Sequence, residues 1–244
     1  MSAFVRVWVA VAIVGACTAD PVSTPAPENE PTPRRVDSKP PAGLAKPPEP
    51  PQSPARPKPP DGLVDLHDHV ADLRLSIGYA TPANFTGAPL PGYEHAGAWA
   101  HPELATALTE VDRELASSSL GLLVFDAYRP ARASKAMVEW TRVHDRSDLL
   151  KDGYISARSQ HNRGLAIDLT LVDRKSGKPI DMGGAWDTFD RSSTTFAAKG
   201  EALANRKRLR TVMTAHRFVP HEGEWWHFSL PHASAAPLDA PYGP

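Results

Sequence analysis

The chain contains almost no cysteine: Cys17 is the only one in 244 residues, so no disulfide can form within the chain. It also lacks an excess of charge of one sign. The formal net charge of −1 gives no basic field that would favour nucleic acid or an anionic membrane surface as a partner. Long apolar runs are scarce as well, and the run from Phe4 to Ala16 is too short to span a bilayer comfortably. These absences exclude a disulfide-stabilised scaffold and favour neither nucleic-acid binding nor a membrane span.

The N-terminal apolar run is typical of a signal peptide, which we place at residues 1–20. It carries a charge, Arg6, near its start and it ends in small residues. Ala16 directly precedes the lone Cys17, and this arrangement resembles a bacterial lipobox, in which the cysteine becomes lipidated. We therefore expect an exported protein, periplasmic or at the cell surface, whose contact with the membrane is a lipid anchor at Cys17. An ordinary cleaved signal with an incidental cysteine is the alternative.

Aromatic residues are absent from residues 21–60, which hold 15 of the 26 prolines. Such a segment cannot bury enough apolar surface to offset the entropy lost when it becomes ordered. Beyond it lie all the aromatic residues except Phe4 and Trp8. We therefore predict a disordered tether over residues 21–61 and one folded domain over residues 62–244.

Helices and strands are mixed within this domain, without a regular strand–helix–strand rhythm. Apolar residues at helical spacing predict helices, and short apolar or alternating runs predict strands. The predicted helices are 102–115, 132–143 and 195–216, and the predicted strands are 64–75, 120–125, 166–172 and 227–230. We therefore expect a single α+β domain with a mainly antiparallel central sheet flanked by helices.

The first chemical motif runs from Ser159 to Asp168. In the predicted strand Asp168 alternates with Ile167 and Leu169, and a carboxylate among such apolar residues needs a partner, most simply a cation. His161 lies seven residues earlier, beyond Gly164, which can turn the chain back. Taken alone, the motif leaves open an aspartate that caps a turn and a histidine on the surface.

The second motif is Glu224-Trp225-Trp226-His227. Glu224 and His227 are three residues apart, so they would point to opposite faces of a straight strand, and the chain must bend for both to reach one site. Taken alone, this motif leaves open a core tryptophan pair flanked by solvated polar residues. Together the two motifs offer two imidazoles, one carboxylate ligand and one spare carboxylate, which is what a catalytic zinc site requires.

The two motifs resemble those of the zinc D-Ala-D-Ala peptidases related to the vancomycin-resistance dipeptidase and the D,D-carboxypeptidases. The matching pattern is Ser159-x-His161-x-x-Gly164-x-Ala166-x-Asp168 followed by Glu224-x-Trp226-His227. Three further stretches, 79–87, 126–130 and 181–187, are similar to the dipeptidase branch, although the last of them departs at Trp186 and in the position of a glycine. The resemblance covers residues 64–230 and implies a D,D-peptidase or hedgehog-like fold with zinc on the sheet.

The resemblance also implies a role for each residue. It makes His161, Asp168 and His227 the ligands of one Zn²⁺ per chain, and Glu224 the general base. It places Arg129 near the scissile carbonyl, where a fixed cation would stabilise the tetrahedral oxyanion; a structural salt bridge is the alternative for Arg129.

Other polar residues have weaker expectations attached to them. Ser159 and Asp181 are expected to place the substrate or to hold the metal ligands. For His67 and His69 we expect a polar strand face rather than a second metal pair.

The function that follows is hydrolysis of D-alanyl-D-alanine, a small D,D-dipeptide, to two D-alanines. Because the chain is expected to be exported, the substrate would be wall-derived D-peptides outside the cytoplasm. One alternative is a zinc D,D-carboxypeptidase or endopeptidase that trims peptidoglycan stems. Another is a lipid-anchored wall-binding module with a structural zinc, but such a module has no need of Glu224. No sequence pattern indicates an oligomeric state.

Overall fold

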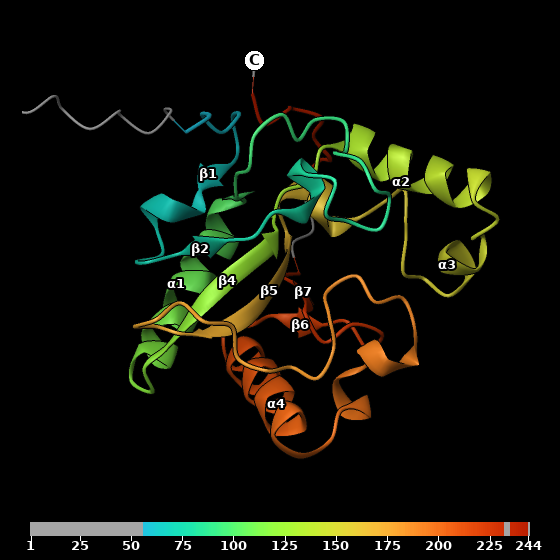
Figure 1. The fold of residues 1–244 in the computed structure, drawn as a ribbon. Helices are drawn as coiled ribbons and strands as arrows, with labels where there is room; N and C mark the ends of the chain where they lie inside the picture. Colours follow the sequence, from blue (N-terminus) through green and yellow to red (C-terminus); the bar gives the residue numbers. More distant parts are fainter. Residues whose placement is uncertain (1–55, 232–234, 244) are drawn as a thin grey trace, which may run out of the picture. The chain divides into compact units, whose positions relative to one another are not determined.

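The computed structural model of the chain describes residues 56–231 and 235–243 (Figure 1). The predicted signal peptide, Cys17 and residues 21–55 of the predicted tether lie outside these ranges. Arg56, within the predicted tether, forms ion pairs of 2.9 Å with Asp65 and with Asp68, so contacts with the domain begin before residue 62. Within the described ranges, no helix combines the length and apolar character needed to cross a bilayer.

A five-stranded sheet lies at the centre of the domain. Its order is β2 (Arg74–Leu75), β4 (Leu120–Asp126), β5 (Ala166–Asp173), β7 (His227–Ser229) and β6 (Val219–Pro220). β2 runs parallel to β4, and the other three pairings are antiparallel. A separate two-stranded sheet pairs β1 (Val64–Asp65) with β3 (Trp99–Ala100). The prediction of an α+β fold is confirmed.

The helices are α1 (Pro102–Ala116), α2 (Ala131–Val143), α3 (Asp148–Lys151) and α4 (Gly200–Ala215). α1 begins with a proline in its first turn, where no intrahelical N–H is needed. α1 and α4 pack against each other and against the sheet, whereas α2 and α3 lie together beyond the end of β4 (Figure 1).

Two sequence predictions of elements were wrong in their extent. The helix predicted from residue 195 begins only at Gly200, because Lys199 is extended (φ −129°, ψ 165°) and residues 195–197 form a single 3₁₀ turn. The strand predicted over 64–75 is interrupted by a 3₁₀ turn at Leu66–Asp68. There the Asp65 carboxylate accepts a hydrogen bond from the His67 N–H, which favours a turn over a strand.

That turn also changes the setting of the two early histidines. His67 and His69 do not alternate on a strand as predicted. The His67 Nδ1 atom instead lies 2.9 Å from the carboxylate of Asp65.

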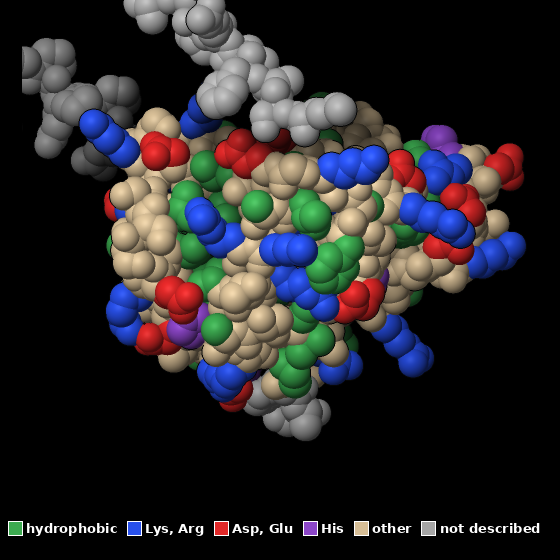
Figure 2. Space-filling view, turned by 90° about the horizontal axis from the view of Figure 1, so that it is seen from below, with side chains coloured by type: hydrophobic (Ala, Val, Ile, Leu, Met, Phe, Trp, Pro, Cys, Tyr) green, Lys and Arg blue, Asp and Glu red, His purple; other side chains and the backbone are tan. Residues whose placement is uncertain are grey.

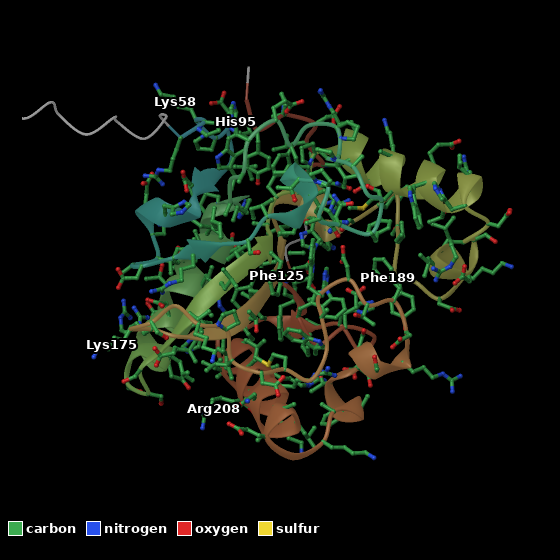
Figure 3. The ribbon with its side chains drawn as sticks, in the orientation of Figure 1. Lys58, His95, Phe125, Lys175, Phe189 and Arg208 are labelled. Carbon is green, nitrogen blue, oxygen red and sulfur yellow. The ribbon has the colours of Figure 1, made fainter. Side chains whose placement is uncertain are left out.

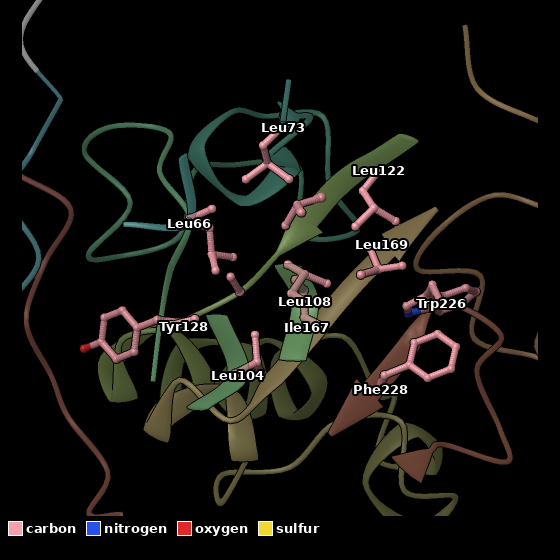
Figure 4. Close-up of a cluster of buried hydrophobic side chains, with 14 of the residues drawn as sticks. Leu66, Leu73, Leu104, Leu108, Leu122, Tyr128, Ile167, Leu169, Trp226 and Phe228 are labelled. Atoms are coloured by element: carbon pink, nitrogen blue, oxygen red, sulfur yellow. The ribbon is translucent and has the colours of Figure 1, made fainter. Parts of the chain in front are cut away.

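The hydrophobic core is built around β4 and β5. Leu122 and Leu169 from these strands lie in one buried cluster with Leu104 and Leu108 of α1, and Trp226 and Phe228 extend it around β7 (Figure 4). Every residue of β5 from Ala166 to Val172 is buried, so both faces of this strand are covered. Asp168 is therefore 2% exposed, and its carboxylate lies within the protein rather than on a solvated sheet face.

The segment 235–243 crosses back over the domain and is held by a buried tyrosine. Tyr242 is fully buried, and its ring stacks on that of Tyr93 at 5.4 Å between centroids. Its hydroxyl donates to the carbonyl of Tyr128 at 2.8 Å. The Leu238 N–H donates to the carbonyl of Asn162, next to His161, at 2.7 Å. The last described residues thus brace segments that carry polar side chains at the centre of the domain.

Candidate metal centre and active site

Three side chains from different parts of the chain meet near the start of β5. The Nδ1 atom of His227 lies 2.9 Å from Oδ1 of Asp168 and 3.2 Å from Nε2 of His161, and that Nε2 lies 3.3 Å from the same Oδ1. Within the described residues they are the one group of three or more His, Cys, Asp or Glu side chains placed to share a metal ion. The structure therefore brings together the three residues that the resemblance assigned to the metal.

The local sequence around His161 sets its position. The Ser159 hydroxyl accepts from the His161 N–H, and Asn162 caps the Ser159 N–H in return, which begins a short 3₁₀ helix over Gln160–Arg163. Gly164 ends this helix in the left-handed region (φ 64°), and a Cβ atom there would lie 2.6 Å from Leu63. The glycine therefore lets the chain turn from His161 directly into β5.

The protonation of His161 follows from its second contact. Its Nδ1 atom lies 2.6 Å from the carbonyl oxygen of Ala127, which can only accept a hydrogen bond. Nδ1 therefore carries the proton, and the lone pair of Nε2 faces Asp168 and His227. A backbone carbonyl that fixes the tautomer in this way is the usual partner of a metal-ligating histidine.

The chain bends before His227, as the spacing required. A turn at Trp225 and Trp226 precedes β7, and Glu224 reaches the same side of the sheet as His227. The Oε2 atom of Glu224 lies 3.9 Å from Nδ1 of His227. Both tryptophans are buried, with their rings edge to face at 5.3 Å, and Trp226 lines the cavity of the site.

The electrostatic setting separates the roles of the two carboxylates. Burial alone would raise the pKa of Asp168, but the imidazoles of His161 and His227 lower it below its ordinary value. Burial, and then the charges of Asp168 and Asp187, raise the pKa of Glu224 well above its ordinary value. Burial lowers the pKa of His227 and favours the neutral imidazole. Asp168 is thus an anion beside two imidazoles, and Glu224 is a carboxyl group with raised proton affinity.

Arg129 is buried beside this cluster. Its Nε and one terminal nitrogen lie 2.9 and 2.8 Å from Oδ2 of Asp126, and the same terminal nitrogen lies 3.7 Å from Oδ2 of Asp168. The guanidinium carbon stands 5.0 Å from the centroid of the Tyr79 ring. Arg129 therefore forms a salt bridge with Asp126, which was the alternative role expected for it. It also lines the same cavity as the metal cluster.

Asp126 and Tyr93 were not among the predicted site residues. The pairing of β4 with β5 shifts register between Val124 and Asp126, and this irregularity sets Asp126 opposite Asp168. The Tyr93 hydroxyl donates to Asp126 at 2.5 Å. Asp126 lies in the 126–130 stretch, so the sequence motif already included its carboxylate. Its partner Tyr93 is 33 residues away, and no sequence motif linked the two residues.

The cluster opens into a cavity of about 190 Å³. Its walls include the aromatic rings of Phe85, Tyr154 and Phe189, of which Phe85 and Phe189 stand edge to face at 5.0 Å; Phe189 comes from the loop between β5 and α4 (Figure 3). His221, for which the sequence suggested no role, also lines it, with Nδ1 accepting from the Gly223 N–H.

Two carboxylates of the 181–187 stretch have different positions. Asp187 lines the cavity and accepts a 2.8 Å hydrogen bond from the Tyr79 hydroxyl. Burial, and then the charge of Asp168, raise the pKa of Asp187 well above its ordinary value. Asp181 does not line this cavity, and its carboxylate caps the Gly183 N–H. Ser159 does line the cavity, so of the two residues expected near the substrate only Ser159 is in place.

A His–Asp–His cluster beside a buried glutamate and a buried arginine, all lining one cavity of an α+β domain, defines a metallohydrolase. The family model Peptidase_M15, described as D-ala-D-ala dipeptidase, matches residues 60–243, and the chain belongs to this family.

Two D-alanyl-D-alanine dipeptidases are similar to this chain over most of their own length. The D-alanyl-D-alanine dipeptidase of Enterococcus faecium is 35% identical over 185 residues, covering 69% of this chain and 91% of its own. That of Escherichia coli K12 is 36% identical over 178 residues, covering 72% and 88%. A vancomycin-resistance D,D-pentapeptidase solved with Zn(II) aligns with 55% of this chain and 74% of its own, at 14% identity and a TM-score of 0.34.

The donor set fits zinc, which is the cofactor of this metallopeptidase. Zn–N and Zn–O bonds of about 2.0–2.2 Å place tetrahedral ligand atoms about 3.3–3.6 Å apart. The three facing atoms here are 2.9, 3.2 and 3.3 Å apart, close to that spacing. Imidazole nitrogens with one carboxylate oxygen are the ligand types of catalytic rather than structural zinc sites.

Proposed function

We propose that the protein hydrolyses D-alanyl-D-alanine to two D-alanines with one zinc ion held by His161, Asp168 and His227. The observation that carries the proposal is the position of Glu224, a buried carboxyl group 3.9 Å from His227 in a cavity of about 190 Å³. Pockets for drug-sized ligands measure about 300–1,000 Å³, so this cavity suits a smaller molecule such as a dipeptide. A site with a purely structural metal would have no use for this carboxyl group.

The residues around the metal divide the chemistry between them. When bound, zinc supplies a Lewis acid that polarises a carbonyl group and acidifies water. Glu224 accepts the proton of the attacking water on its carboxylate and returns it to the leaving amine. Glu224 lies in the cavity with Oε2 3.9 Å from Nδ1 of His227, where it can exchange a proton with the water and with the leaving amine. Arg129, fixed by Asp126, presents a cation to the oxyanion that develops on the scissile carbonyl.

The pair of Asp187 and Tyr79 favours a free dipeptide over a stem peptide. Asp187 is a carboxyl group in the cavity with no cation paired to it among the described residues, apart from the distant charge of Arg129. The free amino group of a dipeptide is an ammonium ion, which would ion-pair with Asp187 and favour its ionised form. A stem peptide presents a neutral amide at that point and would leave Asp187 with only its hydrogen bond from Tyr79.

The substrate proposal is tested with D-Ala-D-Ala, N-acetyl-D-Ala-D-Ala and a stem pentapeptide, on protein whose zinc content is measured in the same sample. We expect N-acetylation to lower kcat/KM by about 100-fold or more. The acetylated substrate lacks the ammonium group that would form an ion pair with Asp187. Equal rates on the free and acetylated dipeptides would contradict the dipeptidase and favour the D,D-carboxypeptidase or endopeptidase.

We further propose that the protein is exported, carries a lipid on Cys17 and acts on wall-derived D-peptides outside the cytoplasm. Support comes from the sequence, in the apolar run that ends at Ala16-Cys17. Mass spectrometry of the protein from the membrane fraction should find a mature N-terminus at a lipid-modified Cys17. A Cys17→Ser variant should be absent from that fraction, and an unmodified mature N-terminus elsewhere in the wild type would rule out the anchor.

A further inference from the structure

The two oxygens of Asp168 face different groups. Oδ1 faces the imidazoles, at 2.9 Å from Nδ1 of His227 and 3.3 Å from Nε2 of His161. Oδ2 faces the other way, where Nε1 of Trp186 lies 3.5 Å from it and a terminal nitrogen of Arg129 lies 3.7 Å from it. The carboxylate thus has one oxygen available to a metal and one oxygen turned toward two N–H donors.

Of these two donors, Arg129 is committed elsewhere. Two of its nitrogens contact Oδ2 of Asp126 at 2.8 and 2.9 Å, and a third donates to the sulfur of Met137 at 3.4 Å. Its distance of 3.7 Å to Asp168 is beyond that of a hydrogen bond. The indole N–H of Trp186 is therefore the nearer and less occupied donor to Oδ2.

The indole is fixed by packing on both sides. Its ring lies 4.7 Å from that of Tyr79 and is stacked at 5.5 Å on that of Phe125. It also fills the space beside Gly78, where a Cβ atom would come within 2.6 Å of the six-membered ring. Because two segments, the turn at Gly78–Ala80 and β4, hold the ring, the direction of its N–H is set by the fold and not by solvent.

We propose that Trp186 is a positioning residue of the metal centre, which holds Oδ2 of Asp168 so that Oδ1 is presented to the zinc. The inference rests on the metal site of the proposed function. The last torsion of an aspartate is broad and roughly two-fold, so packing alone does not fix the carboxylate plane. A hydrogen bond to the oxygen that does not bind metal removes this freedom before the metal arrives.

Trp186→Phe tests the proposal, because it keeps an aromatic ring against Tyr79 and Phe125 and removes the N–H. We expect the zinc affinity of the full-length protein, measured by competition with a chromophoric chelator without substrate, to fall about 10- to 100-fold. The melting temperature of the metal-free protein and the KM of the zinc-loaded protein should stay close to those of the wild type. Trp140→Phe on α2, where the ring packs on Phe85 and His144, is the matched control and should bind zinc like the wild type.

A second variant, Gly78→Ala, keeps the indole N–H but pushes the ring out of place. It should also weaken zinc binding. That result would show that the position of the indole N–H matters, and not only the loss of the indole in Trp186→Phe. Wild-type zinc affinity in Trp186→Phe overturns the proposal. The proposal is also overturned if Trp140→Phe loses as much zinc affinity as Trp186→Phe. It is overturned as well if the loss in Trp186→Phe accompanies a lowered melting temperature of the metal-free protein. A protein that shows the predicted zinc affinities but leaves D-Ala-D-Ala intact would contradict the proposed function and not the role of Trp186.

Discussion

Glu224→Gln should retain one zinc ion per chain and lose most of its turnover of D-Ala-D-Ala. Glutamine keeps the size and hydrogen-bonding capacity of the side chain but cannot accept the proton of the attacking water. General acid–base groups contribute about 10²- to 10⁴-fold, so kcat should fall by that range with little change in KM. The measurement is steady-state kinetics together with metal analysis of the same preparation.

Glu222→Gln is the matched control, two residues away. Glu222 is exposed and pairs with Arg210 on the surface, so its replacement should leave kcat unchanged. If a metal-replete Glu224→Gln protein turned over at the wild-type rate, the base would have to be another group.

His161→Ala should lose both the metal and the activity. The substitution removes one of three ligand atoms and leaves the Ala127 carbonyl without its hydrogen-bond donor. We expect zinc to be absent after gel filtration in metal-free buffer, and activity to fall at least as far as in Glu224→Gln. His69→Ala, at an exposed position of the turn after β1, is the control and should keep both.

The two variants together separate metal binding from proton transfer. Added zinc should restore nothing in Glu224→Gln, and only a high zinc concentration should restore activity to His161→Ala. Stoichiometric zinc in purified His161→Ala would show that His161 is not a ligand.

The residues of the site were predictable because each belongs to a short motif with a geometric requirement. Gly164 predicted the turn between His161 and Asp168, which the structure shows. The three-residue spacing of Glu224 and His227 predicted the bend at residues 225–226. The surroundings of the site were less predictable, because they depend on contacts between distant segments. Tyr93 reaches Asp126 across 33 residues, and Tyr79 reaches Asp187 across 108.

The errors in secondary structure have a similar origin. The alternation of β5 predicted Asp168 on the face opposite Ile167 and Leu169, and the structure buries both faces of the strand. The strand pattern predicted that the Asp168 carboxylate needs a partner but could not say which residues supply it. Phe196, within the predicted first turn of the last helix, is 61% exposed and lies in a separate 3₁₀ turn that ends before α4 begins.

The surface of the domain agrees with its near-neutral charge. On the face in Figure 2, Lys and Arg side chains alternate with Asp and Glu side chains and do not form a single basic field. The charged groups that could recognise a small molecule lie inside the cavity, whose lining includes Arg129, Asp187 and the metal cluster.

The buried Tyr242 has a consequence for the order of events during synthesis. Its ring is one wall around Tyr93, and Tyr93 holds the aspartate that positions Arg129. The N-terminal half of the domain therefore emerges from the ribosome before Tyr242 can pack on Tyr93, which holds the partner of Arg129. At about 5–20 residues per second, translation takes on the order of ten seconds to reach Tyr242 after Tyr93. Every residue of the candidate site, from Arg129 to His227, is therefore synthesised before the Tyr242 ring that packs on Tyr93.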